Sequence, residues 1–377
     1  MPLPAARAGS ELKVLDRKVD YSFWPMGRTT RRYGLQSRLF ATDPWSVIRH
    51  SIDQRSPAGA KTQAQAFRAQ SQDYFRAAEV AGLFTTKPVL LYYSFLNLVK
   101  AFVLTKGLRP EYAAAFHGLK ERLQPQNGRE LFDSTLEAIP SNPNVNIFDD
   151  FLRAIRGNGL AANVTFRVTT ILPQLLQGHR LWCAASREGE RFIELSRIDV
   201  LRDPTTRSLW LVLNIFEDDL TRLGVAHNQV LQGAGLNGRF REVASTETVG
   251  QRRLLKFEQM NPIVYNHRPS DRVPQLVDTI KHDVWANVLS FPPYRKYYVY
   301  VSPLAERPFV LPQPVSVLAF FYYLGSITRY KPQKIADLVD GDYGAQLQEC
   351  VVNLPNQFLY LLASEFARQD VTRAAIV

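Results

Sequence analysis

The sequence predicts an α+β protein that is predominantly α-helical, with a small antiparallel β-rich region inserted between the helical parts. Long stretches toward both ends of the chain repeat apolar residues at helical spacing. The middle of the chain is instead rich in β-branched and aromatic residues with turn signals between them. With 377 residues, 46% of them hydrophobic, the chain is long enough for two domains or one domain with a large insertion.

A first amphipathic helix is predicted at Thr62–Ala81. Phe67 and Tyr74 fall on one face of this helix together with several alanines, whereas charged and amide side chains fall on the others. Gly82 ends the helix, and Pro88 suits the first turn of the next one.

The helix that follows, Val89–Leu104, is strongly apolar but keeps a narrow polar seam. At about 100° per residue, Ser94, Asn97 and Lys100 fall within one arc of its surface. A helix that is apolar over most of its perimeter is buried on several sides, so we expect a central helix with the seam facing water or a partner. The run is too short for a membrane span and contains Lys100, so no membrane association is predicted.

Further helices are predicted on both sides of the β-rich region. A third helix is expected at Glu111–Leu123, and a short one at Phe148–Ile155. The chain returns to helical spacing near its end. These late helices are Pro314–Tyr330, Pro332–Val339 and Gly344–Arg368, the last with a bend at Pro355.

The β-rich region extends from about residue 163 to residue 300. Four stretches are predicted as strands: Phe192–Leu201, Ser208–Phe216, Arg241–Val249 and Lys296–Ser302. Asp203-Pro204 and Asn237-Gly238 supply turn signals between some of them. The chain is thus predicted to consist of a basic irregular arm (1–60), one part of a helical bundle (61–160), the β-rich insertion (161–305) and C-terminal helices that complete the bundle (306–377).

The chain is strongly basic, and most of the excess charge lies near its N-terminus. The formal net charge is +11, and residues 1–68 contribute +7 of it, with twelve Lys and Arg against five Asp and Glu. Such a field attracts polyanions, nucleic acid first. Arginine pairs with phosphates and aromatic rings stack on unpaired bases, so the expected contact residues are Arg28, Arg31, Arg32, Tyr33 and Arg38. The alternative is an arm that pairs with the protein's own acidic surface.

Catalytic candidates are few. Arg222 and His227 have a spacing that could let them clamp a phosphate and move a proton, as a metal-independent ribonuclease requires, or they are an exposed loop pair. Gly233–Gly238 matches the GxGxxG pattern of dinucleotide sites. The residues that follow predict a strand where such a site needs a helix, so a loop is expected. The acidic triplet Glu217–Asp219 is expected to begin a solvated helix.

Neither a metal site nor a cofactor is predicted. The six histidines and two cysteines show no metal-ligand spacing. Cys183 and Cys350 lie far apart in the sequence, which suits a reducing compartment. Residues 1–18 lack the apolar segment of a secretory signal, so a cytoplasmic location is expected.

Three short motifs resemble the YaaC-like proteins of bacteria. They are KPVLLYYSFLNLVKAFVL (Lys87–Leu104), FHGLKERL (Phe116–Leu123) and YYLGSITRYKP (Tyr322–Pro332). Together with Asp43-Pro44-Trp45, they spread the resemblance over most of the chain. This resemblance implies an architecture rather than a reaction.

The order of the first elements is also similar to that of HEPN domains. An amphipathic helix, a helix with a tyrosine pair and the His117-Gly118 segment follow one another. HEPN domains are helical bundles, often RNA-cleaving or nucleotide-binding, and are frequent in toxin–antitoxin and phage-defence systems. The resemblance implies a HEPN-like helical bundle. The late helices carry no Arg and His at the active spacing, so a non-catalytic or divergent bundle is expected.

Three functions remain open from the sequence, and binding is favoured over catalysis. The leading hypothesis is binding of nucleic acid or an acidic partner through the basic N-terminal face. The second is a metal-independent HEPN-type ribonuclease that uses Arg222 and His227. The third is a scaffold subunit or homo-oligomer with a partner-binding seam or pocket. The residues predicted to line it are Ser94, Asn97, Lys100, His117, Arg329 and Tyr330.

Overall fold

The computed structural model describes residues 2–14, 16–25, 38–82, 84–123, 132–303, 305 and 309–374. Of the described residues, 45% are helical and 22% lie in strands, and these strands form five sheets. The fold is therefore α+β with mixed content, and the predicted predominantly helical, HEPN-like bundle is wrong. Strands that the sequence pattern did not reveal occur among residues 10–41 and 119–167, and they account for much of the difference.

The chain divides into two units, each assembled from segments that are distant in sequence. One, here called the β-rich unit, combines Met1–Phe40, Gly189–Pro308 and Arg368–Val377. The other, the helical unit, combines Ala41–Glu188 and Phe309–Ala367. Each unit is described separately below.

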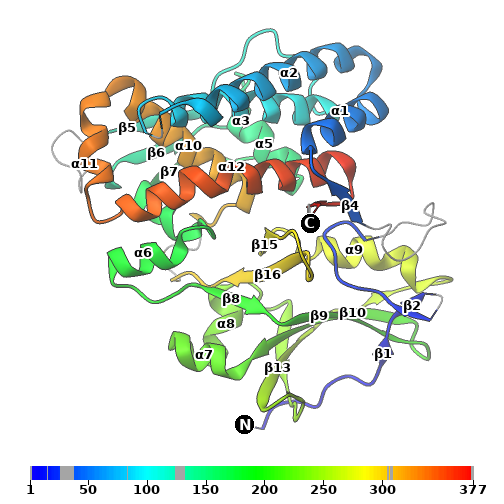
Figure 1. The fold of residues 1–377 in the computed structure, drawn as a ribbon. Helices are drawn as coiled ribbons and strands as arrows, with labels where there is room; N and C mark the ends of the chain where they lie inside the picture. The colour runs from blue at the N-terminus through cyan, green and yellow to red at the C-terminus, as the bar shows by residue number, and fades with distance from the viewer. Residues whose placement is uncertain are drawn as a thin grey trace. The chain divides into compact units, whose positions relative to one another are not determined.

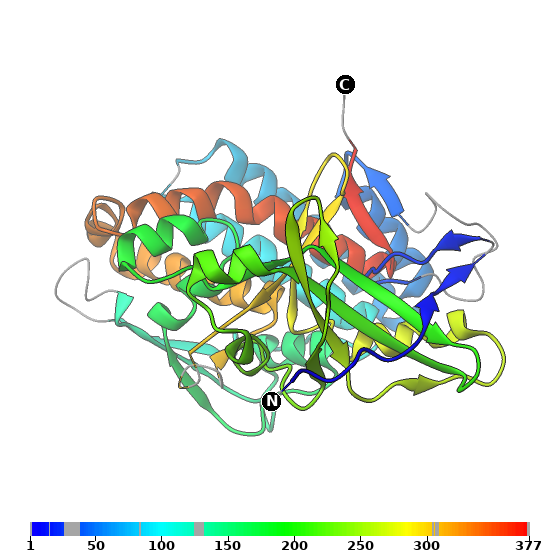
Figure 2. The ribbon, with the colours of Figure 1, turned by 90° about the horizontal axis from the view of Figure 1, so that it is seen from below.

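The β-rich unit contains a seven-stranded antiparallel sheet. Its strands run in the order β1 (Ser10–Glu11), β9 (Arg197–Asp203), β10 (Ser208–Phe216), β13 (Arg252–Gln259) and β11 (Phe240–Val243), with β12 (Thr248–Val249) on β13 and β14 (Ile263–Val264) on β10. Eight of the nine residues of β10 are buried, so this predicted strand is the central one. Figure 2 shows the N-terminal strand in dark blue beside the green strands of this sheet.

Smaller sheets and short helices complete the β-rich unit. The strands are β8 (Phe192–Leu195), β15 (Val284–Val288) and β16 (Arg295–Tyr300) in one sheet, β2 (Lys13–Val14) with β3 (Arg17–Lys18), and β17 (Asp370–Arg373) with β4 (Arg38–Ala41). The helices are α7 (Glu217–Leu223), α8 (His227–Gly233) and α9 (Val273–Asp278). The acidic triplet therefore begins a helix, as predicted.

Two predictions need correction. The stretch predicted as one strand, Phe192–Leu201, is two strands, because Ser196 interrupts it and donates its N–H to the Asn214 carbonyl (2.9 Å). The two halves belong to different sheets. The predicted irregular lead-in at residues 1–60 is also wrong, because its described part contains β1 to β4 and the helix α1 (Pro44–Arg55).

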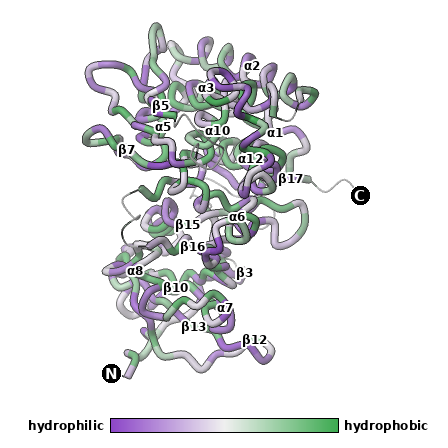
Figure 3. The backbone as a smooth tube through the Cα atoms, turned by 90° about the vertical axis from the view of Figure 1, so that its left-hand side faces the viewer, coloured by the Kyte–Doolittle hydropathy of each residue, from purple (hydrophilic) through white to green (hydrophobic). Residues whose placement is uncertain are grey.

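The helical unit is built around α3 (Lys87–Thr105) and α10 (Gln313–Tyr330), which carry mostly hydrophobic residues (Figure 3). Buried residues make up 14 of the 19 positions in α3 and 15 of the 18 in α10. Around α3 pack α1, α2 (Ala58–Val80), α5 (Ile147–Arg156), α10 and α12 (Gly344–Ala367), while α6 (His179–Ser186) and α11 (Ile335–Val339) pack on α12 (Figure 1). The prediction of a central, buried helix is confirmed.

Length and composition alone would allow α3 to cross a membrane. Its residues are apolar enough for a membrane span, but most of the helix is buried inside the fold. A helix that is covered by its own protein in this way fits the core of a soluble protein.

The polar seam of α3 does not face water along its whole length. Ser94 Oγ donates to the Ser71 carbonyl of α2 (2.8 Å), and Asn97 donates to Gln70 Oε1 (2.9 Å). Ser94 is fully buried and Asn97 is 5% exposed. The first half of the seam is therefore a contact between antiparallel helices, and Lys100 alone of the three predicted seam residues is half-buried rather than buried.

The predicted helix at Glu111–Leu123 is wrong. This segment is irregular up to Gly118 and then forms β5 (Leu119–Arg122), which pairs with β6 (Thr135–Ala138) and through it with β7 (Val164–Arg167). Gly118 has a left-handed φ of +78°, and a Cβ there would lie 3.1 Å from the Phe148 amide nitrogen. The close approach of this segment to the start of α5 explains why a helix cannot form.

Candidate functional site

His117 is held in place by backbone pairing with the loop before α5. Phe116 donates its N–H to the Val145 carbonyl (2.9 Å), and Ile147 donates back to the Phe116 carbonyl (3.0 Å). Phe148 then donates to the His117 carbonyl (3.1 Å). The imidazole is thus presented on a segment fixed on both sides, although it lies in no regular element.

Tyr92 of α3 orients the His117 ring. Its hydroxyl is hydrogen-bonded to His117 Nδ1, and the two rings stack with centroids 5.5 Å apart. Tyr92 is 1% exposed, and burial raises the pKa of its hydroxyl well above the ordinary value. This hydroxyl makes no other hydrogen bond among the described residues, so we assign it as the donor to Nδ1, and the neutral imidazole then carries its proton on Nε2.

The surroundings of His117 favour the neutral form of its imidazole. Burial lowers the pKa of the imidazole below its ordinary 6.5, the positive charges of Arg329 and Lys100 lower it further, and Glu121 opposes them. The side chain is half-buried. His117 therefore offers an Nε2–H hydrogen-bond donor in a region of positive potential.

Arg329, in the last turn of α10, lies among three tyrosine rings. Its guanidinium carbon is 5.8, 5.6 and 5.1 Å from the ring centroids of Tyr92, Tyr93 and Tyr330. Nη1 donates to the Tyr93 hydroxyl (2.9 Å), and Nε donates to the Gly325 carbonyl (3.2 Å). Within the described ranges no carboxylate pairs with this half-buried cation, so its charge is held by rings and neutral oxygens.

Lys100 is a second cation that lies over an aromatic ring. Its ammonium lies 4.9 Å from the centroid of the Phe67 ring on α2, and burial lowers the pKa of the amine. No acidic side chain in the described part of the chain pairs with it. Keeping a half-buried ammonium without an acid costs free energy, which an anionic ligand would offset.

The acid near His117, Glu121, is hydrogen-bonded to Tyr322 of α10. The Tyr322 hydroxyl is hydrogen-bonded to both the Leu119 carbonyl (2.8 Å) and the carboxylate of Glu121 on β5. Burial and the adjacent Glu121 raise the pKa of this hydroxyl, so it stays protonated. Glu121 therefore accepts from a neutral donor rather than from Arg329, while its negative charge partly offsets the positive potential at His117.

We call these side chains the His117 cluster; its members are Tyr92, Tyr93, Lys100, His117, Arg329 and Tyr330. Two rings at its edge are open to solvent, since Tyr330 is 63% and Phe116 is 61% exposed. The cluster therefore combines cations that lack acids among the described residues, a neutral N–H donor and exposed aromatic rings. This combination suits a ligand that is anionic and carries flat rings.

The structure gathers four of the six residues predicted for a seam or pocket. Lys100, His117, Arg329 and Tyr330 belong to one cluster, whereas Ser94 and Asn97 contact α2. Sequence reasoning missed Tyr92, Tyr93 and Tyr322 as site residues. The signal was present, because tyrosine pairs occur in both apolar helices at Tyr92-Tyr93 and Tyr322-Tyr323.

Most of the predicted arginine arm lies outside the described residues, namely Arg28, Arg31, Arg32 and Tyr33. Arg38 begins β4, where its guanidinium lies 3.7 Å from Asp20 and 5.6 Å from the Tyr294 ring. This one arginine is thus held on the protein's own surface, which is the alternative that the sequence left open for the arm.

Arg222 and His227 do not share a helix. Arg222 lies in α7 and pairs with Glu190 (3.1 Å), whereas His227 begins α8 after Gly224, which has a left-handed φ of +64°. The imidazole is next to two carboxylates, Glu242 at 3.2 Å and Glu217 at 3.7 Å. Both side chains are engaged by acids, and the ribonuclease interpretation stays a prediction.

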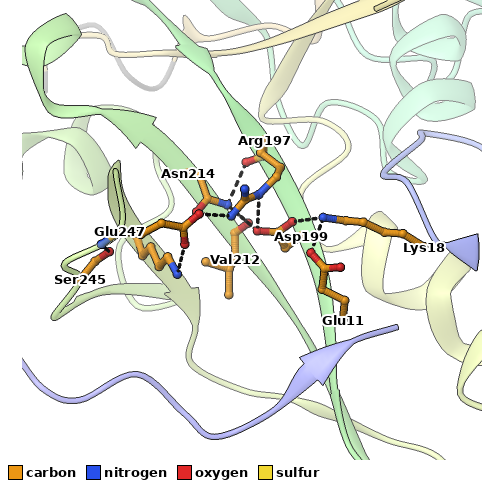
Figure 4. Close-up of polar contacts among 9 residues, drawn as sticks. Glu11, Lys18, Arg197, Asp199, Val212, Asn214, Ser245 and Glu247 are labelled. Carbon is orange, nitrogen blue, oxygen red and sulfur yellow. Dashed lines mark hydrogen bonds and ion pairs between the residues drawn. The ribbon is translucent and has the colours of Figure 1, made fainter. Parts of the chain in front are cut away.

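A second polar cluster lies on the sheet of the β-rich unit (Figure 4). Opposite charges alternate along it, from Glu11 through Lys18 to Asp199 and from Arg197 through Glu247 to Lys256, with distances of 2.6 to 2.9 Å. Asn214 of β10 donates to Asp199 (2.9 Å) below them. Because each charge in this row has an opposite partner, the cluster ties the N-terminal strands to the sheet and offers little attraction to a ligand.

No group of three or more His, Cys, Asp and Glu side chains in the described ranges is placed to hold a metal ion. In the helical unit, Asp149 and Asp150 are instead occupied by protein donors. Asp149 accepts from the Ser141 N–H (2.9 Å), and Asp150 accepts two hydrogen bonds from Arg109 (2.8 and 2.9 Å). These buried acids fix the loops around α5.

The fold and the site define a two-unit α+β protein whose helical unit presents cations among aromatic rings. The family model described as YaaC-like Protein matches residues 29–366. The chain therefore belongs to the YaaC-like family, as the short motifs indicated. Searches of curated proteins and of solved structures found no match, and no finding supports a HEPN-like part.

Proposed function

We propose that this YaaC-like protein acts by binding single-stranded nucleic acid on the His117 cluster. The observation that carries the proposal is the presence of two half-buried cations, Arg329 and Lys100, beside tyrosine and phenylalanine rings and without acidic partners in the described residues. Arginine and lysine bind phosphate oxygens, and ring faces stack on bases of any sequence. A duplex would offer its phosphates but not its base faces.

The net charge of the chain supports the same ligand. The +11 charge draws polyanions toward the protein, and +7 of it lies in residues 1–68. We include Arg28, Arg31, Arg32 and Tyr33 in the proposal as additional contact residues. An acidic protein would be attracted by the charge as well, but it would leave the exposed rings of Tyr330 and Phe116 without a stacking partner.

The proposal does not include a phage-defence or toxin–antitoxin role. That context came from the HEPN resemblance alone, and the mixed fold removes its basis. Cleavage is not included either, because Arg222 and His227, the pair that the sequence suggested for it, are both engaged by carboxylates.

Fluorescence anisotropy with a short labelled strand tests the proposal. We expect single-stranded RNA or DNA to bind with an affinity that falls as salt rises from about 50 to 200 mM, and duplex to bind more weakly. Arg329→Met should weaken binding about tenfold, because it removes one charged contact of about 1.5 kcal/mol. Arg253→Met is the matched control, since Arg253 is exposed and pairs with Glu217 (3.3 Å).

Equal binding by wild type and Arg329→Met would place the contact elsewhere. Stronger competition by polyglutamate than by unlabelled single strands would assign the surface to an acidic protein.

A further inference from the structure

The two cations of the His117 cluster occupy different points along α3. Arg329 is anchored at the Tyr93 hydroxyl (2.9 Å), and Lys100 follows Tyr93 by seven residues. Seven residues are almost two helical turns, so Tyr93 and Lys100 point from the same face about 10 Å apart along the axis.

Each cation is kept at its own end by separate partners. The Arg329 guanidinium is fixed by the Tyr93 hydroxyl and the Gly325 carbonyl, whereas the Lys100 ammonium lies over Phe67 on α2. Phe67 is itself packed edge-on against Tyr112, with centroids 6.2 Å apart. A single phosphate would have to draw one of the cations out of these contacts to touch both.

Aromatic rings lie at the Arg329 end of this face. Tyr74 of α2 stacks on Tyr93, with centroids 5.8 Å apart and planes 30° apart, and both side chains are half-buried. Leu96, one turn before Lys100 on the same face, is 5% exposed and separates these rings from Lys100. The rings therefore lie beside the first phosphate position, where the base attached to that phosphate can stack.

From this spacing we infer that the site binds at least two phosphates of one strand, one at Arg329 and another at Lys100, with a base face against Tyr74 and Tyr93 at the Arg329 end. The inference rests on the proposed function and specifies its ligand as an oligonucleotide rather than a mononucleotide. Stacked nucleotides advance about 3.4 Å each along a strand, so about 10 Å corresponds to two or three nucleotide steps.

Calorimetry with the full-length chain and unlabelled ligands of increasing length tests the inference. We expect mononucleotides to bind weakly, dinucleotides little better, and tetranucleotides at least tenfold more tightly. Lys100→Met should abolish most of this gain and weaken the mononucleotide much less than the tetranucleotide, because the mononucleotide phosphate binds at Arg329. Arg329→Met should weaken ligands of every length.

The double variant separates two phosphates from one. If the cations hold different phosphates, their effects on tetranucleotide affinity multiply, and each substitution lowers the salt slope by about 0.7. If they hold the same phosphate, the second substitution adds little. Lys13→Met, at an exposed position of β2, is the charge-matched control.

Three results bear on the inference in different ways. A mononucleotide that binds as tightly as the tetranucleotide overturns it and leaves the proposed function standing. Non-multiplying effects of the two substitutions also overturn it. Absence of binding by any oligonucleotide rejects both proposals together.

Thermal melting of each variant establishes that the fold is kept. Lys100→Met should melt no earlier than wild type, because burial already disfavours the charged ammonium of Lys100.

Discussion

Ser71 of α2 and Ser94 of α3 exchange hydrogen bonds across the contact between the two helices. Ser71 Oγ donates to the Ser94 carbonyl (2.6 Å), and Ser94 Oγ donates to the Ser71 carbonyl (2.8 Å). Both residues are fully buried. Small side chains with their own donors let the two backbones approach closely without an unsatisfied hydroxyl. This contact sets the position of Tyr93, the residue before Ser94, and of Tyr74, one turn after Ser71.

The serine pair predicts a graded loss of stability. Ser94→Ala should lower the free energy of unfolding by about 1 kcal/mol, because it removes one hydrogen bond and little volume. Ser94→Leu should cost about 2 to 4 kcal/mol, because it adds volume where the helices touch and removes the same bond. Urea unfolding followed by far-UV circular dichroism measures both, and a leucine variant as stable as the alanine variant would contradict the close packing.

The polar seam shows how far the sequence could predict this unit. Helical spacing, Gly82 and Pro88 indicated α2 and α3, and the apolar perimeter of α3 predicted its burial. The same periodicity could not tell a polar side chain that faces water from one that faces a neighbouring helix. Ser94 and Asn97 were therefore placed on an open seam, although only their pairing with α2 decides their environment.

The predicted helix at Glu111–Leu123 failed for a similar physical reason. Its residues have helical spacing, but the segment pairs with residues 145–148, about thirty positions later in the chain. Gly118 carries the positive φ that this pairing needs. Such non-local contacts also gather Lys100, His117 and Arg329 into one cluster, and no spacing rule connects positions that distant.

At Gly325, α10 approaches α3 closely, which allows a prediction about larger side chains at this position. A Cβ at this position would lie 3.3 Å from the Tyr92 Cβ and 3.7 Å from the Pro88 carbonyl oxygen. Gly325→Ala should change stability by less than about 1 kcal/mol, because the strain opposes the better helix propensity of alanine.

A larger side chain at the same position should separate the helices. Gly325→Leu is expected to destabilise the protein by about 2 kcal/mol or more and to weaken oligonucleotide binding, because it displaces Tyr92 and with it Arg329. Thermal melting and anisotropy measured on both variants check this. A leucine variant that melts and binds like wild type would show that the α3–α10 contact is looser than described.

Asp150 is expected to stabilise the helical unit at a place away from the His117 cluster. It is 2% exposed and accepts from Arg109 and from the Tyr112 hydroxyl (3.1 Å). Asp150→Asn keeps the shape but removes the charge that both donors meet, so we expect a loss of about 2 kcal/mol. Asp73→Asn, at an exposed position of α2, should leave the unfolding free energy within about 0.5 kcal/mol of wild type. Equal unfolding curves for the two variants would contradict this role of Asp150.

His117 predicts the pH dependence of both stability and binding. Burial, with the charges of Arg329 and Lys100, holds the pKa of the imidazole in the free folded protein below its ordinary 6.5. The unfolded chain therefore binds a proton more readily than the folded one, so the contribution of His117 to stability is present above pH 6.5 and is lost as pH falls through and below that value.

An anionic ligand reverses the electrostatic balance at the same ring. A phosphate beside His117 raises the pKa of the imidazole in the complex, so binding takes up a proton and affinity should rise as pH falls from slightly alkaline to about 5. His117→Gln should flatten this dependence, whereas His50→Gln, at an exposed position of α1, should not.

A strand without terminal phosphates is the suitable ligand for this measurement. Its phosphodiesters do not titrate in this pH range, so any change of affinity with pH then belongs to the protein. Affinity that is independent of pH in the wild type would show that the bound anion lies too far from His117 to affect its protonation, and the phosphate position at Arg329 would have to be abandoned.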